Sequence, residues 1–329
     1  MRKHLSWLSL NELERCSHER VGDMKILLTG SEGQLGCALR GSLPQVLQNS
    51  SVELIATSRS GGDGLLALDL ANSDACRAAV FESKPDWVIN AGAYTAVDRA
   101  ETEPELAHAV NALAPRAFAE AMAQTGGRLL QLSTDFVFNG RQGHPYKLDQ
   151  PRGPLGVYGA TKAAGEQAIA ELLGVEREGR AGLLRTSWVY GPVGANFLLT
   201  MLRLHRQKSL AAEPLRVVAD QVGCPTSTAG LAGACWRMVE RQLGGVMHWS
   251  DAGAASWYDF AVAIGELAED SGTLESAAQV QPISSADYPT PAQRPAYSLL
   301  DCSSSRELLG LMPKHWRQAL QEVIADVGT

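Results

Sequence analysis

A glycine-rich stretch directly follows a short apolar run near the start of the chain, in MKILLTGSEGQLG from Met24 to Gly36. The apolar run is typical of a buried parallel strand. Gly30, Gly33 and Gly36 allow a tight turn into a helix and a close approach of the backbone to a pyrophosphate at the helix N-terminus. Glycines also serve purely structural turns. Here, however, they lie between a strand and a helix, and this context predicts dinucleotide binding.

Apolar runs and helical segments alternate after this turn. The runs 52–58, 85–92, 128–138 and 181–191 predict further strands, and the segments between them predict helices. Strands that alternate with helices at this spacing pair in parallel, with helices on both faces of the sheet. The sequence therefore predicts an α/β protein with a Rossmann-type doubly wound parallel sheet and a smaller C-terminal substrate-binding domain.

This pattern divides the chain into three parts. Residues 24–190 form the predicted NAD(P)-binding Rossmann domain, and residues 191–329 mainly form the substrate-binding domain, with some segments returning to the first. Residues 1–23 contain a short apolar segment that polar residues interrupt, so they do not resemble a signal peptide. We interpret them as a poorly ordered extension, with an upstream start-codon artefact as the alternative.

Charge and cysteine content exclude several classes of protein. A net charge of -7 argues against a protein that coats nucleic acid, and no stretch approaches the length of a membrane span. Six cysteines are scattered without a C-x-x-C pair, and the histidines show no metal-ligand spacing. We therefore predict a cytoplasmic protein without a bound metal, a nucleic-acid partner or a membrane partner.

The end of the second predicted strand bears on the choice of cofactor. It carries Ser58 and Arg59 where an acidic residue would bond the ribose hydroxyls of NAD and repel a 2′-phosphate. A hydroxyl and a guanidinium instead suit a 2′-phosphate. We predict NADPH as the cofactor, with NADH as the alternative. The competing interpretation of Arg59 is a solvated loop arginine.

Three further residues are candidates for acid–base chemistry. Thr134 lies near the carboxyl end of a predicted strand, where ligands of doubly wound folds bind. Tyr158 and Lys162, four residues apart in VYGATKAAGE, share one face of a predicted helix. Taken singly, the Ser-Thr-Asp run is typical of a turn, and the Tyr-x-x-x-Lys spacing also arises by chance.

Together the three side chains form a coherent catalytic device. Tyrosine, whose pKa in water is about 10, is a weak acid near neutrality. A neighbouring ammonium on Lys162 stabilises the phenolate of Tyr158 and lowers its pKa. The Thr134 hydroxyl can orient a substrate carbonyl against the tyrosine, while a nicotinamide cofactor supplies hydride.

From Met24 to its end the sequence resembles the extended short-chain dehydrogenase/reductase superfamily and, within it, the dTDP-4-dehydrorhamnose reductases. Eight motifs in the order of that family carry the resemblance, which makes it more specific than any single motif. They are ILLTGSEGQLG, NAGAYTAVDRAETEPE, STDFVFNG, YGATKAAGE, RTSWVYG, NFLLTMLRL, DQVGCPT and YPTPAQRP.

The resemblance implies a function and further site residues. The implied reaction is the NADPH-dependent reduction of dTDP-4-dehydro-6-deoxy-L-mannose to dTDP-L-rhamnose, with Tyr158 as proton donor to the C4 oxygen and Lys162 on the nicotinamide ribose. Thr134, Asp135 and Trp188 would contact the sugar, although a core position is the alternative for Trp188. The residues implied along the cofactor, beside the glycines, are Gln34, Leu35, Asp69, Leu70, Ala91, Gly92, Ala93, Tyr94 and Thr95.

The sequence departs from the family pattern at three places. Phe136 replaces a usual tyrosine, so one peripheral hydroxyl is lost, and Gly92 stands where alanine is common. Ser58 and Arg59 replace the usual acidic end of the second strand, which strengthens the preference for NADPH. Some relatives pair through magnesium-bound glutamates, but no ligand spacing supports this here, and a homodimer stays an open option.

Two alternatives to this function stay open. One is another nucleotide-sugar enzyme of the same superfamily, either a 4-ketoreductase for a different sugar or an epimerase. DQVGCPT and YPTPAQRP favour the rhamnose branch over these enzymes. The other alternative is a non-catalytic regulatory subunit that binds the cofactor as a structural ligand, and the intact set of Thr134, Tyr158 and Lys162 argues against it.

Overall fold

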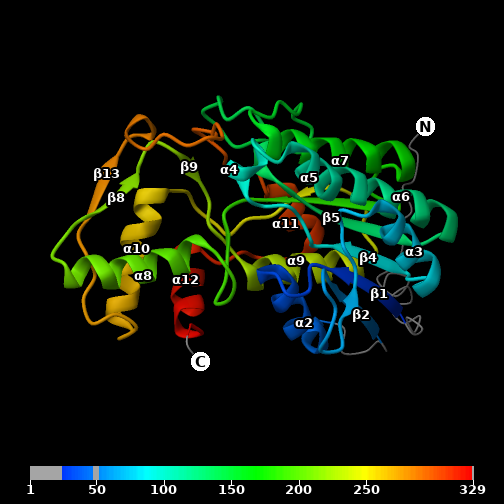
Figure 1. Cartoon of the computed structure of the whole chain (residues 1–329), viewed down its shortest axis with the longest axis horizontal. Helices are drawn as coiled ribbons and strands as arrows, with labels where there is room; N and C mark the ends of the chain where they lie inside the picture. The colour runs from blue at the N-terminus through cyan, green and yellow to red at the C-terminus, as the bar shows by residue number, and fades with distance from the viewer. Residues whose placement is uncertain (1–23, 47–51, 328–329) are drawn as a thin grey trace, which may run out of the picture.

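A computed structural model of the chain describes residues 24–46 and 52–327. Figure 1 shows a sheet covered by helices on one side of the molecule and a smaller group of helices and short strands on the other. The predicted N-terminal extension, residues 1–23, lies outside the described residues.

Seven parallel strands form the central sheet, in the order β11-β6-β5-β4-β1-β2-β3. The chain runs outward from β1 to β3 and then returns to the other side of β1 to form β4. Ligands of doubly wound folds bind at such a reversal, beyond the carboxyl ends of the strands. The predicted fold class is confirmed. The strands are β1 (Met24–Thr29), β2 (Val52–Ser58), β3 (Leu66–Ala67), β4 (Trp87–Asn90), β5 (Arg128–Thr134), β6 (Ala181–Thr186) and β11 (Gly245–His248).

Helices cover both faces of this sheet. One face carries α2, α9 and α11, and the other carries α3, α6 and α7. Their bounds are α2 (Gln34–Val46), α3 (Ser73–Ser83), α6 (Ala114–Thr125), α7 (Val157–Leu173), α9 (Thr228–Glu240) and α11 (Ser303–Leu309).

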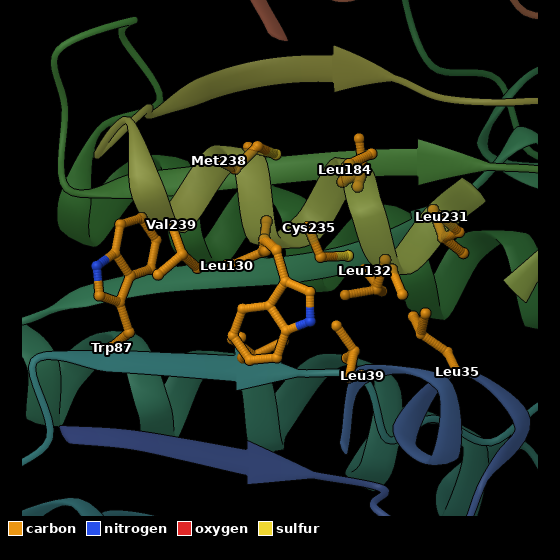
Figure 2. Packing of buried hydrophobic residues seen from close by; sticks show 14 of the residues in the cluster. Leu35, Leu39, Trp87, Leu130, Leu132, Leu184, Leu231, Cys235, Met238 and Val239 are labelled. Carbon is orange, nitrogen blue, oxygen red and sulfur yellow. The ribbon is translucent and has the colours of Figure 1, made fainter. Parts of the chain in front are cut away.

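Alternating side chains of the strands fill the two cores. In β1, Ile26 and Leu28 face the core under α2 and α9, whereas Leu27 faces the core under α3 and α6. Figure 2 shows the first of these cores, with Trp87 of β4 and Leu132 of β5 packed among side chains of α2 and α9. Because both faces of each strand are buried, the strands read as continuous apolar runs in the sequence.

A second group of elements has a core of its own, built around Phe260, Ile264 and Leu320. Two strands of this group, β8 and β13, pair in parallel although they lie far apart in the sequence. The elements are α8 (Phe197–Leu210), β8 (Leu215–Val218), α10 (Trp257–Asp270), β13 (Val280–Ile283) and α12 (Trp316–Ala325).

Two pairs of very short strands connect this group to the sheet. The strand β7 (Val189–Tyr190) pairs with β10 (Thr226–Ser227), and β9 (Val222–Gly223) pairs with β12 (Ala255–Ser256). Since β11 (Gly245–His248) belongs to the seven-stranded sheet, the chain returns from the second group to the first before it forms α10.

Two of the predicted strands end earlier than their apolar runs do. The strand β5 stops at Thr134, because the Thr134 hydroxyl accepts a hydrogen bond from the Phe136 amide and starts a 3-10 turn over Asp135–Val137. The strand β6 stops at Thr186, since Trp188 has a φ of 47° that no strand accommodates. Both breaks place side chains of the candidate site beyond the strand ends.

The alanine-rich segment 105–126 forms most of α5 (Pro104–His108), a π-helical turn over Ala109–Leu113 and then α6. The short helix α4 (Val97–Ala100) precedes it. Among the described residues, no helix is long and apolar enough to span a membrane.

Candidate active site

The glycine-rich turn connects β1 to α2 as the sequence predicts. Gly30 has a φ of 66°, and its carbonyl accepts a hydrogen bond from the Gly33 amide. A side chain at Gly36 would place its Cβ 2.1 Å from the Gly30 carbonyl oxygen, and one at Gly30 would place its Cβ 2.6 Å from Gly92 Cα. The backbone therefore leaves space only for glycine at these two positions, and it exposes the start of α2 to the adjoining cavity.

A cavity of about 490 Å³ lies at the carboxyl ends of β1, β4 and β5. Its lining combines the turn, the residues that follow β4, and Tyr158 and Lys162 of α7. The predicted cofactor residues that line it are Gly30, Gly33, Gln34, Leu35, Gly36, Ala91, Gly92, Ala93, Thr95, Tyr158 and Lys162. The structure thus brings two distant motifs to one cavity.

A larger cavity, of about 660 Å³, lies at the opposite ends of the strands, around Met24, Trp87 and Arg128. It contains none of the predicted site residues. Parallel sheets bind their ligands at the carboxyl ends of the strands, so we assign the site to the smaller cavity.

The Gln34 side chain connects the turn to the second group of elements. Its amide nitrogen donates to the Ala195 carbonyl at 3.3 Å, and its carbonyl oxygen accepts from the Asn196 amide at 2.9 Å. Asn196 in turn caps the start of α8. The position of α8 is therefore linked directly to the turn.

The remaining predicted cofactor residues lie outside the lining of this cavity. Ser58 is buried and its hydroxyl accepts a hydrogen bond from the Gly61 amide, whereas Arg59 is exposed. The Asp69 carboxylate accepts from the Ala71 amide, and the Leu70 side chain lies against Gly92. Tyr94 donates its hydroxyl to Glu103 at 2.6 Å. Arg59, rather than Ser58, has an exposed charged group that can meet a phosphate.

Tyr158 lines the cavity, whereas the buried Thr134 lies close to Tyr158 but does not line the cavity. Burial raises the pKa of Tyr158 to about 12, against a smaller opposing effect of Thr134. The Tyr158 ring also meets Phe136 edge-on, with 5.4 Å between ring centroids. The neutral phenol is therefore the stable form near neutrality, as a proton donor requires.

Lys162 differs in one respect from the sequence-based interpretation, which gave it the task of lowering the pKa of Tyr158. Its ammonium donates to the Leu132 carbonyl at 2.6 Å, and the pKa of Tyr158 is raised. Burial lowers the pKa of Lys162 itself to about 8, against the opposing effect of Glu166. Desolvation is the largest cause of both shifts in pKa.

Asp135 is a buried polar group that directly follows β5. The Thr134 hydroxyl donates to its Oδ1 at 2.9 Å, while its Oδ2 is buried without a hydrogen-bond partner. Burial raises the pKa of Asp135 to about 6, against hydrogen bonds from Ser298 and Thr134. A buried oxygen without a partner is costly unless a ligand satisfies it.

A buried ion pair below these residues was not predicted from the sequence. Glu166 is fully buried and accepts from the Arg185 guanidinium at 2.8 and 2.7 Å and from the Ser133 hydroxyl at 2.6 Å. Burial raises the pKa of Glu166, but Arg185, together with Ser133 and Arg152, outweighs this effect and holds the pKa below its ordinary value. The glutamate sits four residues after Lys162 in YGATKAAGE, and this helical spacing was the available signal.

Trp188 follows β6 and does not line the cavity, although its neighbour Val189 does. The Trp188 indole lies parallel to that of Trp257, with ring centroids 3.5 Å apart. The side chain is only partly buried and packs against the second core. These contacts fit the core position, and the sugar contact stays a prediction.

A second pocket, of about 500 Å³, lies beside the second group of elements. The motifs DQVGCPT and YPTPAQRP meet there: Asp220 and Gln221 lie opposite the segment 288–294. Arg294 forms an ion pair with Asp98 of α4 at 2.7 Å, which links this pocket to the residues that follow the cofactor loop. Within residues 24–46 and 52–327, no group of three or more histidine, cysteine, aspartate or glutamate residues could hold a metal ion.

The sequence profile of the family described as the RmlD substrate binding domain matches residues 24–329. The chain belongs to this family. The match includes both the glycine-rich turn and the second group of elements, so it extends over both parts of the fold.

Several relatives with assigned names match almost the whole chain. A protein of Aggregatibacter actinomycetemcomitans named dTDP-4-dehydrorhamnose reductase is 37% identical over 307 residues, which cover 92% of this chain and 98% of that protein. A protein of the same name from Streptomyces griseus is 40% identical over 304 residues, with coverage of 90% and 91%.

Solved structures agree with this relationship. A dTDP-4-dehydrorhamnose reductase of Bacillus anthracis in complex with NADP is 32% identical, with a TM-score of 0.80 and coverage of 93% of this chain and 100% of that one. A UDP-glucose 4-epimerase of Thermus thermophilus in complex with NAD is 21% identical, with a TM-score of 0.71 and coverage of 92% and 98%. At that identity the epimerase shows the shared fold alone.

Proposed function

We propose that this chain catalyses the NADPH-dependent reduction of the C4 keto group of dTDP-4-dehydro-6-deoxy-L-mannose, which yields dTDP-L-rhamnose. One observation carries the proposal: a single cavity is lined by the glycine-rich turn and by Tyr158 and Lys162. The names of the relatives, at 37% and 40% identity over nearly the whole chain, support the choice of substrate.

The cavity suits a dinucleotide cofactor. Glycine at positions 30 and 36 keeps the backbone open where the pyrophosphate would lie against the start of α2. The exposed Arg59 guanidinium would bind the 2′-phosphate and favour NADPH, while NADH stays a usable substitute. When bound, the nicotinamide supplies the hydride that adds to C4.

Tyr158 would deliver the proton that completes the reduction. As C4 gains a hydride, the C4 oxygen acquires the electron pair of the carbonyl π bond and takes the phenolic proton of Tyr158. Lys162, whose ammonium donates to the Leu132 carbonyl, would hold the nicotinamide ribose. Thr134, which lies close to Tyr158, would orient the carbonyl.

The sugar would lie beyond β5 and β6. The unpartnered Oδ2 of Asp135 would accept a hydrogen bond from a sugar hydroxyl, which would remove the cost of leaving this oxygen unsatisfied. Trp188 would pack against the apolar face of the deoxysugar. Since 6-deoxy sugars have a methyl group at C6, an indole suits them better than a second polar group would.

Three further expectations belong to this proposal. We propose a division of the chain into a cofactor domain at 24–190 and a mainly substrate-binding domain at 191–329. We also propose that the protein acts in the cytoplasm. We propose a homodimer as its assembly state, which sedimentation or light scattering of the purified protein would test.

The nearest competing function is that of an epimerase or a different nucleotide-sugar ketoreductase. An epimerase returns its hydride and keeps its cofactor, so oxidised cofactor that copurifies with the protein, without net oxidation of added NADPH, would support it. A non-catalytic subunit would bind NADPH and reduce no nucleotide-sugar.

Parallel turnover assays test the proposal. The protein is incubated with the keto-sugar and either NADPH or NADH, and the loss of cofactor absorbance is followed together with the sugar product. We expect stoichiometric formation of dTDP-L-rhamnose with both cofactors and a higher kcat/KM with NADPH. No product with either cofactor would contradict the proposed function.

A further inference from the structure

Trp188 has a backbone conformation that bulky residues seldom adopt. Its φ is 47°, in the left-handed region, and its carbonyl accepts a hydrogen bond from the Thr226 amide at 3.1 Å. Such a conformation costs free energy and persists only where the surroundings enforce it, as they often do at functional sites. The neighbours of the Trp188 side chain therefore decide where the indole lies.

Two neighbours define a narrow slot for the Trp188 indole. Trp257 stacks on it with an interplanar angle of 5° and 3.5 Å between centroids. A side chain at Gly223 would place its Cβ 2.6 Å from Cε2 and 2.7 Å from Nε1 of Trp188. Contacts this short exclude any residue but glycine at position 223 unless the indole moves.

The two neighbours are fixed relative to each other by backbone pairing. In the antiparallel pair of β9 and β12, Gly223 faces Ala255 and Val222 faces Ser256. Ser256 and Asp259 form a capping box at the start of α10, which sets the position of its first residue, Trp257. The slot is therefore held by main-chain hydrogen bonds and not only by the packing of the second core.

The slot is close in the sequence to residues of two cavities. Val189, next to Trp188, lines the cavity that contains Tyr158. Gln221, two residues before Gly223, lines the pocket formed by the DQVGCPT and YPTPAQRP segments.

We propose that Trp257 and Gly223 are positioning residues that hold the Trp188 indole in one fixed place, next to Val189 of the cavity that contains Tyr158, and thereby set how the keto-sugar presents C4 to Tyr158. This inference rests on the proposed function. It adds two residues that themselves need not touch the sugar, and it explains the left-handed backbone of Trp188 as a consequence of placing the indole in the slot.

A spectroscopic experiment tests the slot without any substrate. Two stacked indoles whose transition dipoles are rotated relative to each other within the parallel planes give an exciton couplet in the far-ultraviolet circular dichroism spectrum. We expect this couplet in the wild type and in Phe197→Leu, since Phe197 contacts Trp257 but is not part of the slot. The couplet should vanish in Trp257→Phe and weaken in Gly223→Ala. A couplet unchanged in Trp257→Phe would overturn the stacked arrangement.

Steady-state kinetics with the keto-sugar test the positioning role. Because a misplacement of about 1 Å can cost about 10²-fold in rate, we expect kcat/KM for the keto-sugar to fall by about 10²-fold in Gly223→Ala and Trp257→Ala. Trp257→Phe, which keeps an aromatic ring, should recover part of this loss. The dissociation constant for NADPH should stay within about twofold of the wild type.

Phe197→Leu is the matched control for a purely structural effect, because it removes an aromatic contact from the same core. If it lowers kcat/KM as much as Gly223→Ala does, or if the slot variants turn over the keto-sugar like the wild type, the inference is wrong and the proposed function stands. If the wild type itself does not reduce the keto-sugar, both the function and the positioning role fail.

Discussion

The cofactor side and the substrate side of the site are built in different ways. On the cofactor side, Gly30, Gly33 and Gly36 lie within one short stretch of sequence, and backbone geometry alone forms the cradle. On the proposed substrate side, Trp188, Gly223 and Trp257 come from three separate segments that short strand pairs bring together. The cofactor side is local in sequence, and the substrate side depends on the tertiary structure.

This difference separates the expected effects of mutations. Changes on the cofactor side should alter NADPH binding, and changes on the substrate side should alter the handling of the sugar. Tyr158 belongs to both sides of the site. Its substitution should affect the chemical step more than the binding of NADPH or of the sugar. The following predictions test this separation, from the largest expected effect to the smallest.

Tyr158→Phe removes the proton donor and keeps the ring. We expect kcat to fall by about 10²–10⁴-fold, the range for loss of a general acid, with the dissociation constant of NADPH changed little. Stopped-flow measurement of NADPH oxidation, together with a fluorescence titration of NADPH, provides both values. A variant with unchanged kcat would remove Tyr158 from the chemistry.

Glu166→Gln breaks the buried ion pair between Glu166 and Arg185. Arg185 would be left with an uncompensated buried charge, so we expect the free energy of unfolding to fall by about 3–5 kcal/mol. Urea denaturation measures this change. Glu171→Gln, on the exposed side of the same helix, is the control and should change stability by less than about 0.5 kcal/mol. Equal losses in both variants would contradict the account of this pair.

Asp135→Asn tests the substrate side through the pH dependence of the free energy of unfolding. Because the pKa of Asp135 is raised from 3.8 to about 6 in the folded protein, its contribution to stability is present below about pH 4 and is lost as the pH rises through about 6. We expect the variant to gain on the order of 3 kcal/mol of stability relative to the wild type between about pH 4 and pH 7. Urea titrations of both proteins measure the difference in unfolding free energy at each pH. A difference that does not change with pH would contradict the raised pKa of Asp135.

Gly36→Ala tests the cofactor side. Its Cβ would lie 2.1 Å from the Gly30 carbonyl oxygen, so the turn must shift. Overpacking of this kind costs about 1–3 kcal/mol, and we expect the affinity for NADPH to fall by roughly 10–100-fold. Gly41→Ala, in the same helix with no atom within 4 Å of the added Cβ, is the control and should bind NADPH like the wild type. Equal NADPH affinities in the two variants would mean that the tight turn does not bind the cofactor.

Arg59→Ser removes the charge proposed to meet the 2′-phosphate. We expect the ratio of kcat/KM for NADPH to that for NADH to fall about tenfold, as one exposed charge-assisted hydrogen bond is lost. The values for NADH should hardly change. An unchanged ratio would mean that Arg59 is a solvated loop residue that does not bind the 2′-phosphate.

The sequence predicts the cofactor side well because its determinants are local. The turn at Gly30–Gly36 and the strand that precedes it lie in one stretch, and the alternation of apolar runs predicts the parallel sheet. The π-helical turn at Ala109–Leu113 and the exposed strand β13 carry no such local signal, because packing against distant segments determines them.

The substrate side could be predicted only in part. Resemblance to a family singled out Trp188, but nothing in the sequence near it points to Gly223 or Trp257. The effect of burial on Tyr158 was also missed, because desolvation depends on the whole surrounding fold. For the Glu166–Arg185 pair, the helical position of Glu166 can be predicted from the sequence. Its partner Arg185 lies on a strand, and the sequence does not show that the two meet.

Isotope transfer tests the central claim most directly, namely that one cavity brings a nicotinamide cofactor and a C4 keto-sugar together at Tyr158. The protein is incubated with the keto-sugar and with NADPH that carries deuterium at the transferable hydride, and the product is analysed by NMR. Our account predicts dTDP-L-rhamnose with deuterium at C4, formed far more slowly by Tyr158→Phe. A product without deuterium at C4, or equal rates in the two proteins, would contradict it.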